Sequence, residues 1–427
     1  MTASQSAAPR RGSTYVLVLG LSAIIMTLAL GAMVVARLQA RQGRGTADVA
    51  HARLSAHAAI QMGRRIIKND PDWRQNHPNG TWWTKPLGSG GATASLQVID
   101  PADGDLADDD LEPVVLTGTG TRNLAAQKMR VTLLADATGL GCLQTALHAG
   151  NDLKFNACTV QCNQAVSANN NVDASGADVW ADAEAANDVS GGTYHGTTTA
   201  RVDSRSMPDP STILDEYKSR GTWIPQWALP WEDGARTIAE VVLSPGHNPY
   251  WPYSLNTNGI YYIPCQGRNV CIRDCRIVGT LVLLNAGGDN TRLEGSVHWE
   301  PAVENYPALL VDGKLTFALS ASALDEAAIP ENFNPPHTPY DGQSDADTED
   351  LYPSRIEGLV YADDNAYAAS GTHTVHGVIV VGNTFEALPG SLLNLRYDGR
   401  YLSDPPPGFI ERVDMTVAEG SYRRVVE

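Results

Sequence analysis

The stretch YVLVLGLSAIIMTLALGAMVVA occupies residues 15–36 and contains no charged side chain in its 22 residues. At a rise of about 1.5 Å per residue, a helix of this length measures about 33 Å, which matches the thickness of the hydrocarbon layer of a bilayer. A helix satisfies its own backbone hydrogen bonds in lipid. The stretch therefore predicts a transmembrane helix. The alternative, a cleaved secretory signal, needs a shorter apolar core followed by an Ala-x-Ala-like site.

The helical pattern continues beyond this apolar stretch. Residues 37–68 are rich in alanine and lack proline. Small and apolar residues at spacings of three and four form one stripe, namely Val49, Ala52, Ala56, Ala59, Ile60, Gly63 and Ile67. Asn69, Asp70 and Pro71 then interrupt the pattern. We expect one helix that is apolar all round in its first half and amphipathic in its second.

Charge is distributed unevenly along the chain. The net charge is -17, but residues 1–68 hold nine Lys or Arg and one acid, so the remainder carries a net charge of -25. Such an acidic body disfavours nucleic acid as a partner, whereas the basic residues beside the span suit anionic lipid. Arg10 and Arg11 favour a cytoplasmic N-terminus, although three arginines just after the span leave the reverse orientation open.

All six cysteines follow the apolar stretch, at Cys142, Cys158, Cys162, Cys265, Cys271 and Cys275. An even number favours a disulfide framework in an oxidising compartment, although sequence cannot select the pairing. Two pairs of cysteines are spaced four residues apart, but neither forms the C-x-x-C knuckle of structural zinc, and no metal site is predicted. Buried free thiols are the remaining alternative.

A small antiparallel sheet is predicted within residues 71–138. Apolar and polar residues alternate in residues 92–99, 113–118 and 127–134, and turn-forming residues separate these segments. The segment TGTRNLAA connects the last two as a hairpin loop. Because a small sheet needs a cover for its apolar face, we expect the amphipathic half of the helix to pack on it.

This combination resembles the type IV pilin-like proteins, in particular minor pilins of the PilX kind. The resemblance covers about residues 8–135 and is carried by the tail ending Arg10-Arg11-Gly12, the uncharged span, the alanine-rich helix and the small sheet. It implies an inner-membrane anchor that later packs in a filament with other pilin-like subunits. Gly12 would precede a prepilin-peptidase cut, and Ser13 would be the first mature residue. Ser13 replaces the usual aromatic residue or methionine, and Leu17 stands where pilins have a glutamate.

From residue 139 onward the sequence consists of short apolar runs separated by Gly, Asn and Asp. In residues 259–299 these runs recur about every 7 to 10 residues, which is too close for intervening helices. This pattern predicts a right-handed parallel β-helix, with a β-sandwich as the alternative. The segments GVIVVGNT and YDGRYLSDPPPGF are similar to C-terminal parts of bacterial β-helical surface proteins with pilin-like N-termini.

Two insertions, residues 207–253 and 323–352, interrupt this pattern. Long loops on a β scaffold commonly carry binding functions. The first insertion contains four candidate ligand-binding or partner-binding aromatics, Trp223, Trp227, Trp231 and Trp251. Their planar faces suit a sugar or a protein surface, so a surface polysaccharide is one candidate partner.

The sequence contains no recognisable catalytic motif, such as a G-x-S-x-G elbow, an H-E-x-x-H helix or a Walker loop. His373 and His376 are expected on opposite faces of a strand. One set of acids, Asp178, Asp182, Glu184 and Asp188, resembles the carboxylates of polysaccharide-cleaving enzymes, with ordinary surface acids as the alternative.

A second acidic run lies between the predicted strands of the small sheet. It contains Asp103, Asp105, Asp108, Asp109, Asp110 and Glu112 but lacks the spacing of an EF-hand loop. We interpret it as a solvated loop and predict no cofactor, with Ca²⁺ kept as an alternative.

The sequence therefore predicts a mainly β protein with one long N-terminal helix. The expected domains are a cytoplasmic tail (1–14), a transmembrane half-helix (15–36), its amphipathic continuation (37–70), a small antiparallel sheet (71–138) and an exported β-helix-like domain (139–427). The predicted function is a structural or adhesive pilin-like surface protein, a minor subunit or assembly component of a system like a type IV pilus or type II secretion. The alternative is a carbohydrate-active enzyme or carbohydrate-binding protein.

Overall fold

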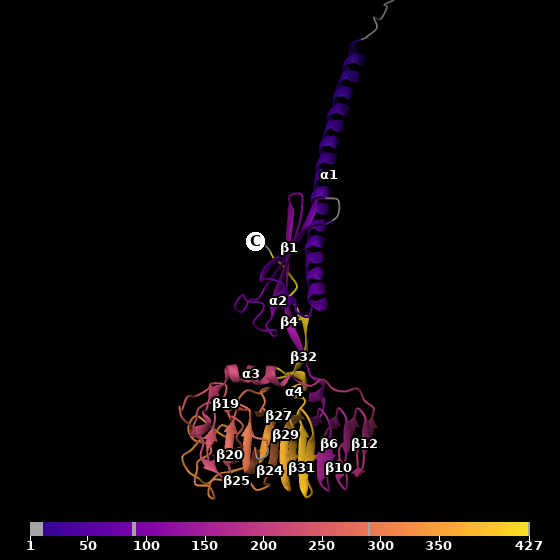
Figure 1. The fold of residues 1–427 in the computed structure, drawn as a ribbon. Helices are drawn as coiled ribbons and strands as arrows, with labels where there is room; N and C mark the ends of the chain where they lie inside the picture. Colours follow the sequence, from indigo (N-terminus) through magenta and orange to yellow (C-terminus); the bar gives the residue numbers. More distant parts are fainter. Residues whose placement is uncertain (1–11, 88–90, 289–290, 426–427) are drawn as a thin grey trace, which may run out of the picture. The chain divides into compact units, whose positions relative to one another are not determined.

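The computed structural model describes residues 12–87, 91–288 and 291–425 (Figure 1). Residues 1–11 of the predicted basic tail (1–14) lie outside the described residues. The chain forms two compact units. Unit 1 contains the described residues up to Asp136 together with those from Asp414 onward, and unit 2 contains Ala137–Val413. The sequence placed residues 139–427 in the last domain, whereas the residues from Asp414 onward belong to unit 1, where they pair with its sheet.

The predicted helix is a single element, α1 (Gly12–Asn69). Side chains from Thr14 to Ala47 are exposed, and the buried stripe begins only at Ala52. It continues through Ala56, Ala59, Ile60, Gly63 and Ile67, as predicted. Val49 is 42% exposed and does not belong to the stripe. At this level of the helix the contacts with the sheet are polar, because Asp48 pairs with Arg122 and accepts a hydrogen bond from Asn123. The helix therefore has one bare half and one packed half.

The sheet of unit 1 has the strand order β1-β2-β3-β4-β32, and β33 also pairs with β4. The strands are β1 (Gly80–Leu87), β2 (Ala92–Ile99), β3 (Val114–Arg122), β4 (Ala125–Gly139), β32 (Ile410–Val417) and β33 (Arg423–Val425), and a short helix, α2 (Trp73–Asn76), precedes them. The predicted eight-residue hairpin loop is wrong, since Arg122 pairs with Ala125 across a two-residue turn. Asn123 adopts a φ of 52° there, which suits an asparagine.

Helix α1 packs directly on β3 through two glycines. A Cβ atom at Gly118 would lie 2.2 Å from the Ala56 carbonyl oxygen, and one at Gly120 would lie 2.0 Å from that of Ala52. Only a residue without a side chain allows the backbones of helix and strand to approach this closely. These contacts fix the packed half of α1 against the sheet.

Unit 2 begins with coils of short parallel strands. The first ten are β5 (Leu147–Ala149), β6 (Leu153–Phe155), β7 (Thr159–Cys162), β8 (Val166–Ala168), β9 (Asn171–Asp173), β10 (Asp178–Trp180), β11 (Ala183–Ala185), β12 (Asp188–Ser190), β13 (Thr193–Tyr194) and β14 (Thr198–Ala200). They stack in parallel as β5-β8-β11-β14, β6-β9-β12 and β7-β10-β13. Three ladders running along a stack of coils form a parallel β-helix architecture.

The remaining coils follow after α3 (Pro210–Arg220). Their strands are β15 (Thr222–Trp223), β16 (Trp231–Glu232), β17 (Ala235–Ala239), β18 (Val242–Leu243), β19 (Ile260–Pro264), β20 (Val270–Val278), β21 (Thr280–Leu284), β22 (Arg292–Glu300), β23 (Leu309–Val311), β24 (Leu315–Leu319), β27 (Arg355–Ala362), β28 (Ala366–Ala368), β29 (Gly371–Val381), β30 (Phe385–Ala387) and β31 (Ser391–Tyr397), and a short α4 (Arg400–Ser403) ends the unit. Their coil-to-coil pairings are parallel, which excludes the β-sandwich alternative.

The last coil pairs with the first. Strands β29, β30 and β31 form parallel pairs with β5, β6 and β7, respectively. The chain therefore enters the stack in its interior, builds coils toward one end, and returns from the other end to close against its own beginning (Figure 1).

The predicted first insertion, residues 207–253, is only partly an interruption, because β15, β17 and β18 lie within it and pair in parallel with β19 and β20 of the coils. Helix α3 and the second insertion cover the coils. Helix α3 carries Asp209 as its N-cap, which accepts a hydrogen bond of 3.1 Å from the Thr212 amide, and Pro210 follows in the first turn. Its Ile213 and Tyr217 pack in a cluster with the outward-facing Val282 and Leu310 of the coils. The second insertion contributes an antiparallel pair of strands, β25 (Leu324–Asp325) and β26 (Leu351–Tyr352), and a smaller core around Phe333.

The predicted disulfide framework is not present, because all six cysteines are free thiols. Five of them are buried, and Cys158, Cys265 and Cys275 belong to the central core of the coils. Burial raises the pKa of Cys142 and Cys265 to about 12, so both are protonated at neutral pH. These cysteines act as small apolar core residues.

Candidate functional site

The bare half of α1 presents a long exposed apolar surface. Tyr15 is 77% exposed, Leu28 is 68% exposed and Val35 is 52% exposed. The helix passes the length and hydropathy criteria for a membrane span, and none of its most apolar window is buried. The predicted processing residues Gly12 and Ser13 form its first two positions, and Leu17 is exposed on it. A surface of this kind requires lipid or other subunits as a cover.

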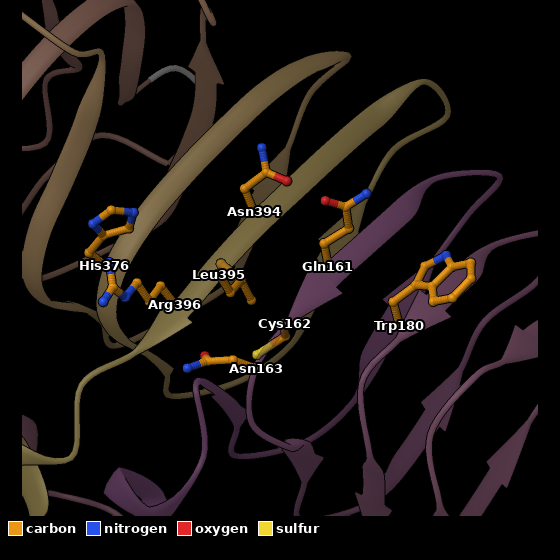
Figure 2. Close-up of a pocket in the computed structure, with 8 residues that line it drawn as sticks. All are labelled: Gln161, Cys162, Asn163, Trp180, His376, Asn394, Leu395 and Arg396. Carbon is orange, nitrogen blue, oxygen red and sulfur yellow. The ribbon is translucent and has the colours of Figure 1, made fainter.

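Unit 2 carries an open pocket of about 590 Å³ on the ladder of β29, β31, β7 and β10 (Figure 2). It is lined by Gln161, Cys162, Asn163, Trp180, His376, Asn394, Leu395 and Arg396. The register pairs Trp180 with Gln161 and Gln161 with Asn394, so the three side chains stand side by side on successive strands. The pocket thus combines one large aromatic face with a row of amides.

Trp180 is held in place by a second ring. The His195 imidazole stacks on it with ring centroids 3.6 Å apart and an interplanar angle of 8°. Trp180 is nevertheless 52% exposed, so part of the indole remains open to solvent. Burial raises the pKa of the neighbouring Cys162 to about 11, so this thiol is neutral and unreactive near pH 7. The pocket is therefore suited to binding rather than to thiol chemistry.

The structure gathers three of the four predicted aromatics. The Trp251 ring lies 6.2 Å from Trp223 and 5.0 Å from Trp227, measured between centroids. Trp231 is 54% exposed and lies under the guanidinium of Arg236 at 5.5 Å, in the β16–β17 hairpin. Trp223, Trp227 and Trp251 therefore form a partly exposed aromatic cluster. In the described part of the chain, Trp231 makes no ring contact with this cluster.

The carboxylates that resemble those of polysaccharide-cleaving enzymes are engaged individually. Glu184 forms an ion pair of 2.6 Å with Arg205, and Asp182 accepts a hydrogen bond from the Thr197 amide. Asp178 lies 3.8 Å from His195, and Asp188 is exposed on β12. Each acid thus has a local role or faces solvent.

His373 and His376 lie on opposite faces of β29, as expected. His373 is 1% exposed, and its Nε2 lies 2.8 Å from the Ala369 carbonyl. His376 is partly exposed and lines the pocket in Figure 2. Burial lowers the pKa of both imidazoles. Only His376 is placed to contact a ligand.

The acidic run forms the loop between β2 and β3. Two further charged residues, Asp100 and Arg74, lie beside it. Asp100 directly follows β2 and is 2% exposed, and Arg74 from α2 lies 3.9 Å from it. Close contact with the Asp100 carboxylate and burial raise the pKa of Glu112 to about 7. Asp103 and Asp108 also interact, and burial together with this contact raises the pKa of Asp108. The loop therefore concentrates negative charge next to one guanidinium.

The sequence pattern did not identify Trp180, Gln161 and Asn394, because residues more than 200 positions apart become neighbours only when the last coil closes on the first. Asp100 was missed because it lies at the end of a predicted strand. An Asp immediately after a strand, followed by further acids, was the available signal.

No protein-family model matches the chain, and no curated protein matches it. The crystal structure of the competence-associated pilin ComZ from Thermus thermophilus is similar at 12% sequence identity and a TM-score of 0.34, over 89% of this chain and 98% of that chain. The function proposed below therefore rests on the geometry of this chain alone.

Proposed function

We propose that this chain is a pilin-like subunit, which α1 anchors in the bacterial inner membrane with its N-terminus in the cytoplasm and then carries into a surface filament. The observation that supports this proposal is a single helix whose first half is bare and apolar and whose second half is packed on an antiparallel sheet. A helix that served only its own domain would not expose its most apolar residues.

The same helix can serve membrane and filament in turn. In lipid, its apolar side chains are covered by acyl chains, and in a filament they are covered by the same surface of other subunits. Arg37, Arg41 and Arg44 follow the apolar segment and are exposed, where they suit anionic headgroups. The close contacts of Gly118 and Gly120 with α1 hold the sheet against the helix, so the sheet moves with it. The function is structural or adhesive rather than enzymatic.

The test is the intact mass of the native protein from membranes and from material sheared off the cell surface. We expect a membrane-bound full-length form and a sheared form that lacks residues 1–12. Gly12→Val should prevent the loss of these residues and deplete the sheared fraction, whereas Gly43→Val, at an open position of the same helix, should be cleaved like the wild type. Full-length protein confined to membranes would contradict the filament role.

A second candidate function is carbohydrate binding by the Trp180 pocket. An exposed indole stacked on a histidine, beside the amides of Gln161 and Asn394, offers a sugar both a flat apolar face and hydrogen-bonding groups. This arrangement favours a surface polysaccharide, and Arg396, which also lines the pocket, can pair with an acidic group of such a ligand.

Binding to such polysaccharides can be measured by affinity electrophoresis of the purified chain. We expect Trp180→Ala to weaken binding about tenfold, equivalent to about 1.4 kcal/mol. The matched control is Trp231→Ala, which removes a tryptophan of similar exposure outside the pocket. Equal migration of wild type and the Trp180 variant on all polysaccharides that retard the protein would contradict this function.

A further inference from the structure

The loop between β2 and β3 contains buried carboxylate oxygens with no donor. Oδ1 of Asp100 accepts a hydrogen bond of 2.7 Å from the Ala102 amide. In the part of the chain that the structure describes, neither Oδ2 of Asp100 nor Oε2 of Glu112 accepts a hydrogen bond, although both atoms are buried from solvent. The side chain of Asp100 is 0% exposed. A buried carboxylate oxygen without a partner is costly, so its environment requires explanation.

A third carboxylate converges on the same point. One oxygen each from Asp100, Asp103 and Glu112 lie within 4.8 Å of one another. Oxygen ligands lie about 2.3–2.6 Å from a bound Ca²⁺, so two ligands on opposite sides of the ion are separated by about twice that distance. The three oxygens therefore fit within one coordination sphere.

Arg74 offsets only part of the negative charge of this cluster. Its guanidinium lies 3.9 Å from Oδ2 of Asp100, beyond hydrogen-bonding distance. It donates instead to the carbonyls of Leu106 at 3.3 Å, Asp110 at 3.3 Å and Glu112 at 2.5 Å. Arg74 thus shapes the loop through its backbone, while residues 100–112 contain seven carboxylates. One positive charge leaves a strong excess of negative charge.

We propose that Asp100, Asp103 and Glu112 bind a Ca²⁺ ion. Hard carboxylate oxygens are the ligands this ion prefers, and backbone carbonyls or water complete its shell. The site does not follow the EF-hand spacing, because its ligands come from the two ends of a loop that joins neighbouring strands. Binding ties the start of the loop to its end and supplies the positive charge that the buried oxygens lack.

The test is calorimetric titration of the full chain in detergent with CaCl₂ up to about 10 mM, in about 0.15 M NaCl to suppress diffuse counterion binding. We expect one saturable site. Asp103→Asn replaces a carboxylate ligand at the exposed side of the cluster with a neutral amide and should weaken binding about tenfold or more. Asp109→Asn preserves the hydrogen bond to the Leu111 amide and should leave affinity within about twofold of wild type.

Terbium luminescence gives a second readout, because the Trp73 ring lies 4.7 Å beneath the Arg74 guanidinium, next to the loop. Calcium should displace terbium from wild type and from the Asp109 variant. Absence of saturable calcium binding would overturn the proposal. Equal affinities of the Asp103 and Asp109 variants would also overturn it, because the loop would then act only as a diffuse acidic surface.

Discussion

Gly118→Val is expected to separate α1 from the sheet of unit 1. The new Cβ would lie 2.2 Å from the Ala56 carbonyl oxygen, and this atom belongs to the helix backbone and cannot rotate away. The added γ-methyl groups increase the clash, so the helix must shift outward and lose contact with Leu96 and Leu116. Overpacking of this kind costs about 1–3 kcal/mol, and we expect the upper end of that range.

Hydrogen exchange of the full chain in detergent measures this effect locally. Amides of residues 52–67 should exchange faster in the Gly118 variant, while those in the bare half of the helix should not change. Thr119→Val is the matched control, because residue 119 faces away from the helix and valine favours a strand. Unchanged protection of α1 in the Gly118 variant would show that the close backbone approach is not required.

Arg276→Met is expected to release the second insertion, residues 323–352, from the coils of unit 2. The Arg276 side chain is 0% exposed and forms an ion pair of 2.5 Å with Glu300. It also donates to the carbonyls of Phe333 at 2.7 Å, Thr338 at 3.0 Å and Pro339 at 2.8 Å. The guanidinium lies 5.2 Å from the ring of Tyr340. One side chain thus holds three backbone groups of the insertion.

Methionine can fill part of this space but satisfies none of these acceptors. Removal of one partner from a buried ion pair costs about 3–5 kcal/mol, and the orphaned carbonyls act in the same direction. Limited proteolysis and hydrogen exchange should both show the insertion opening. The control is Arg273→Met on the same strand, where a 31% exposed arginine pairs with Glu232 and should contribute less than about 1 kcal/mol. Equal protease resistance of the two variants would refute the anchoring role of Arg276.

The helix and its buried stripe could be predicted from sequence because both depend on local periodicity. The spacing of Ala52, Ala56 and Ala59 already identified the packed face, and the uncharged run identified the bare half. Strands β2 and β3 followed from alternation, but the return of β32 and β33 to the same sheet did not. That pairing joins residues nearly 300 positions apart, and no local pattern encodes it.

The coils could be predicted as a class but not in their order. Short apolar runs bounded by Gly and Asn indicate stacked parallel strands wherever they occur. The candidate pocket depends on which coils become neighbours. The sequence therefore did not indicate that Trp180 and Asn394 lie in the same pocket. The disulfide prediction failed because it relied on the even number of cysteines. Their roles depend instead on their positions in the fold, where most of them are buried packing residues.

The closure of the last coil on the first also determines when this domain can fold. Asn156 and Glu386 are hydrogen-bonded at 2.8 Å across a sequence separation of 230 residues. At a synthesis rate of about 5–20 residues per second, β29, β30 and β31 are made roughly ten seconds or more after β5, β6 and β7, with which they pair. During that interval β5, β6 and β7 present unpaired strand edges, which are prone to aggregate. A chain with this topology therefore depends on rapid completion or on a holding chaperone, and C-terminal truncation exposes the centre of the stack rather than one of its ends.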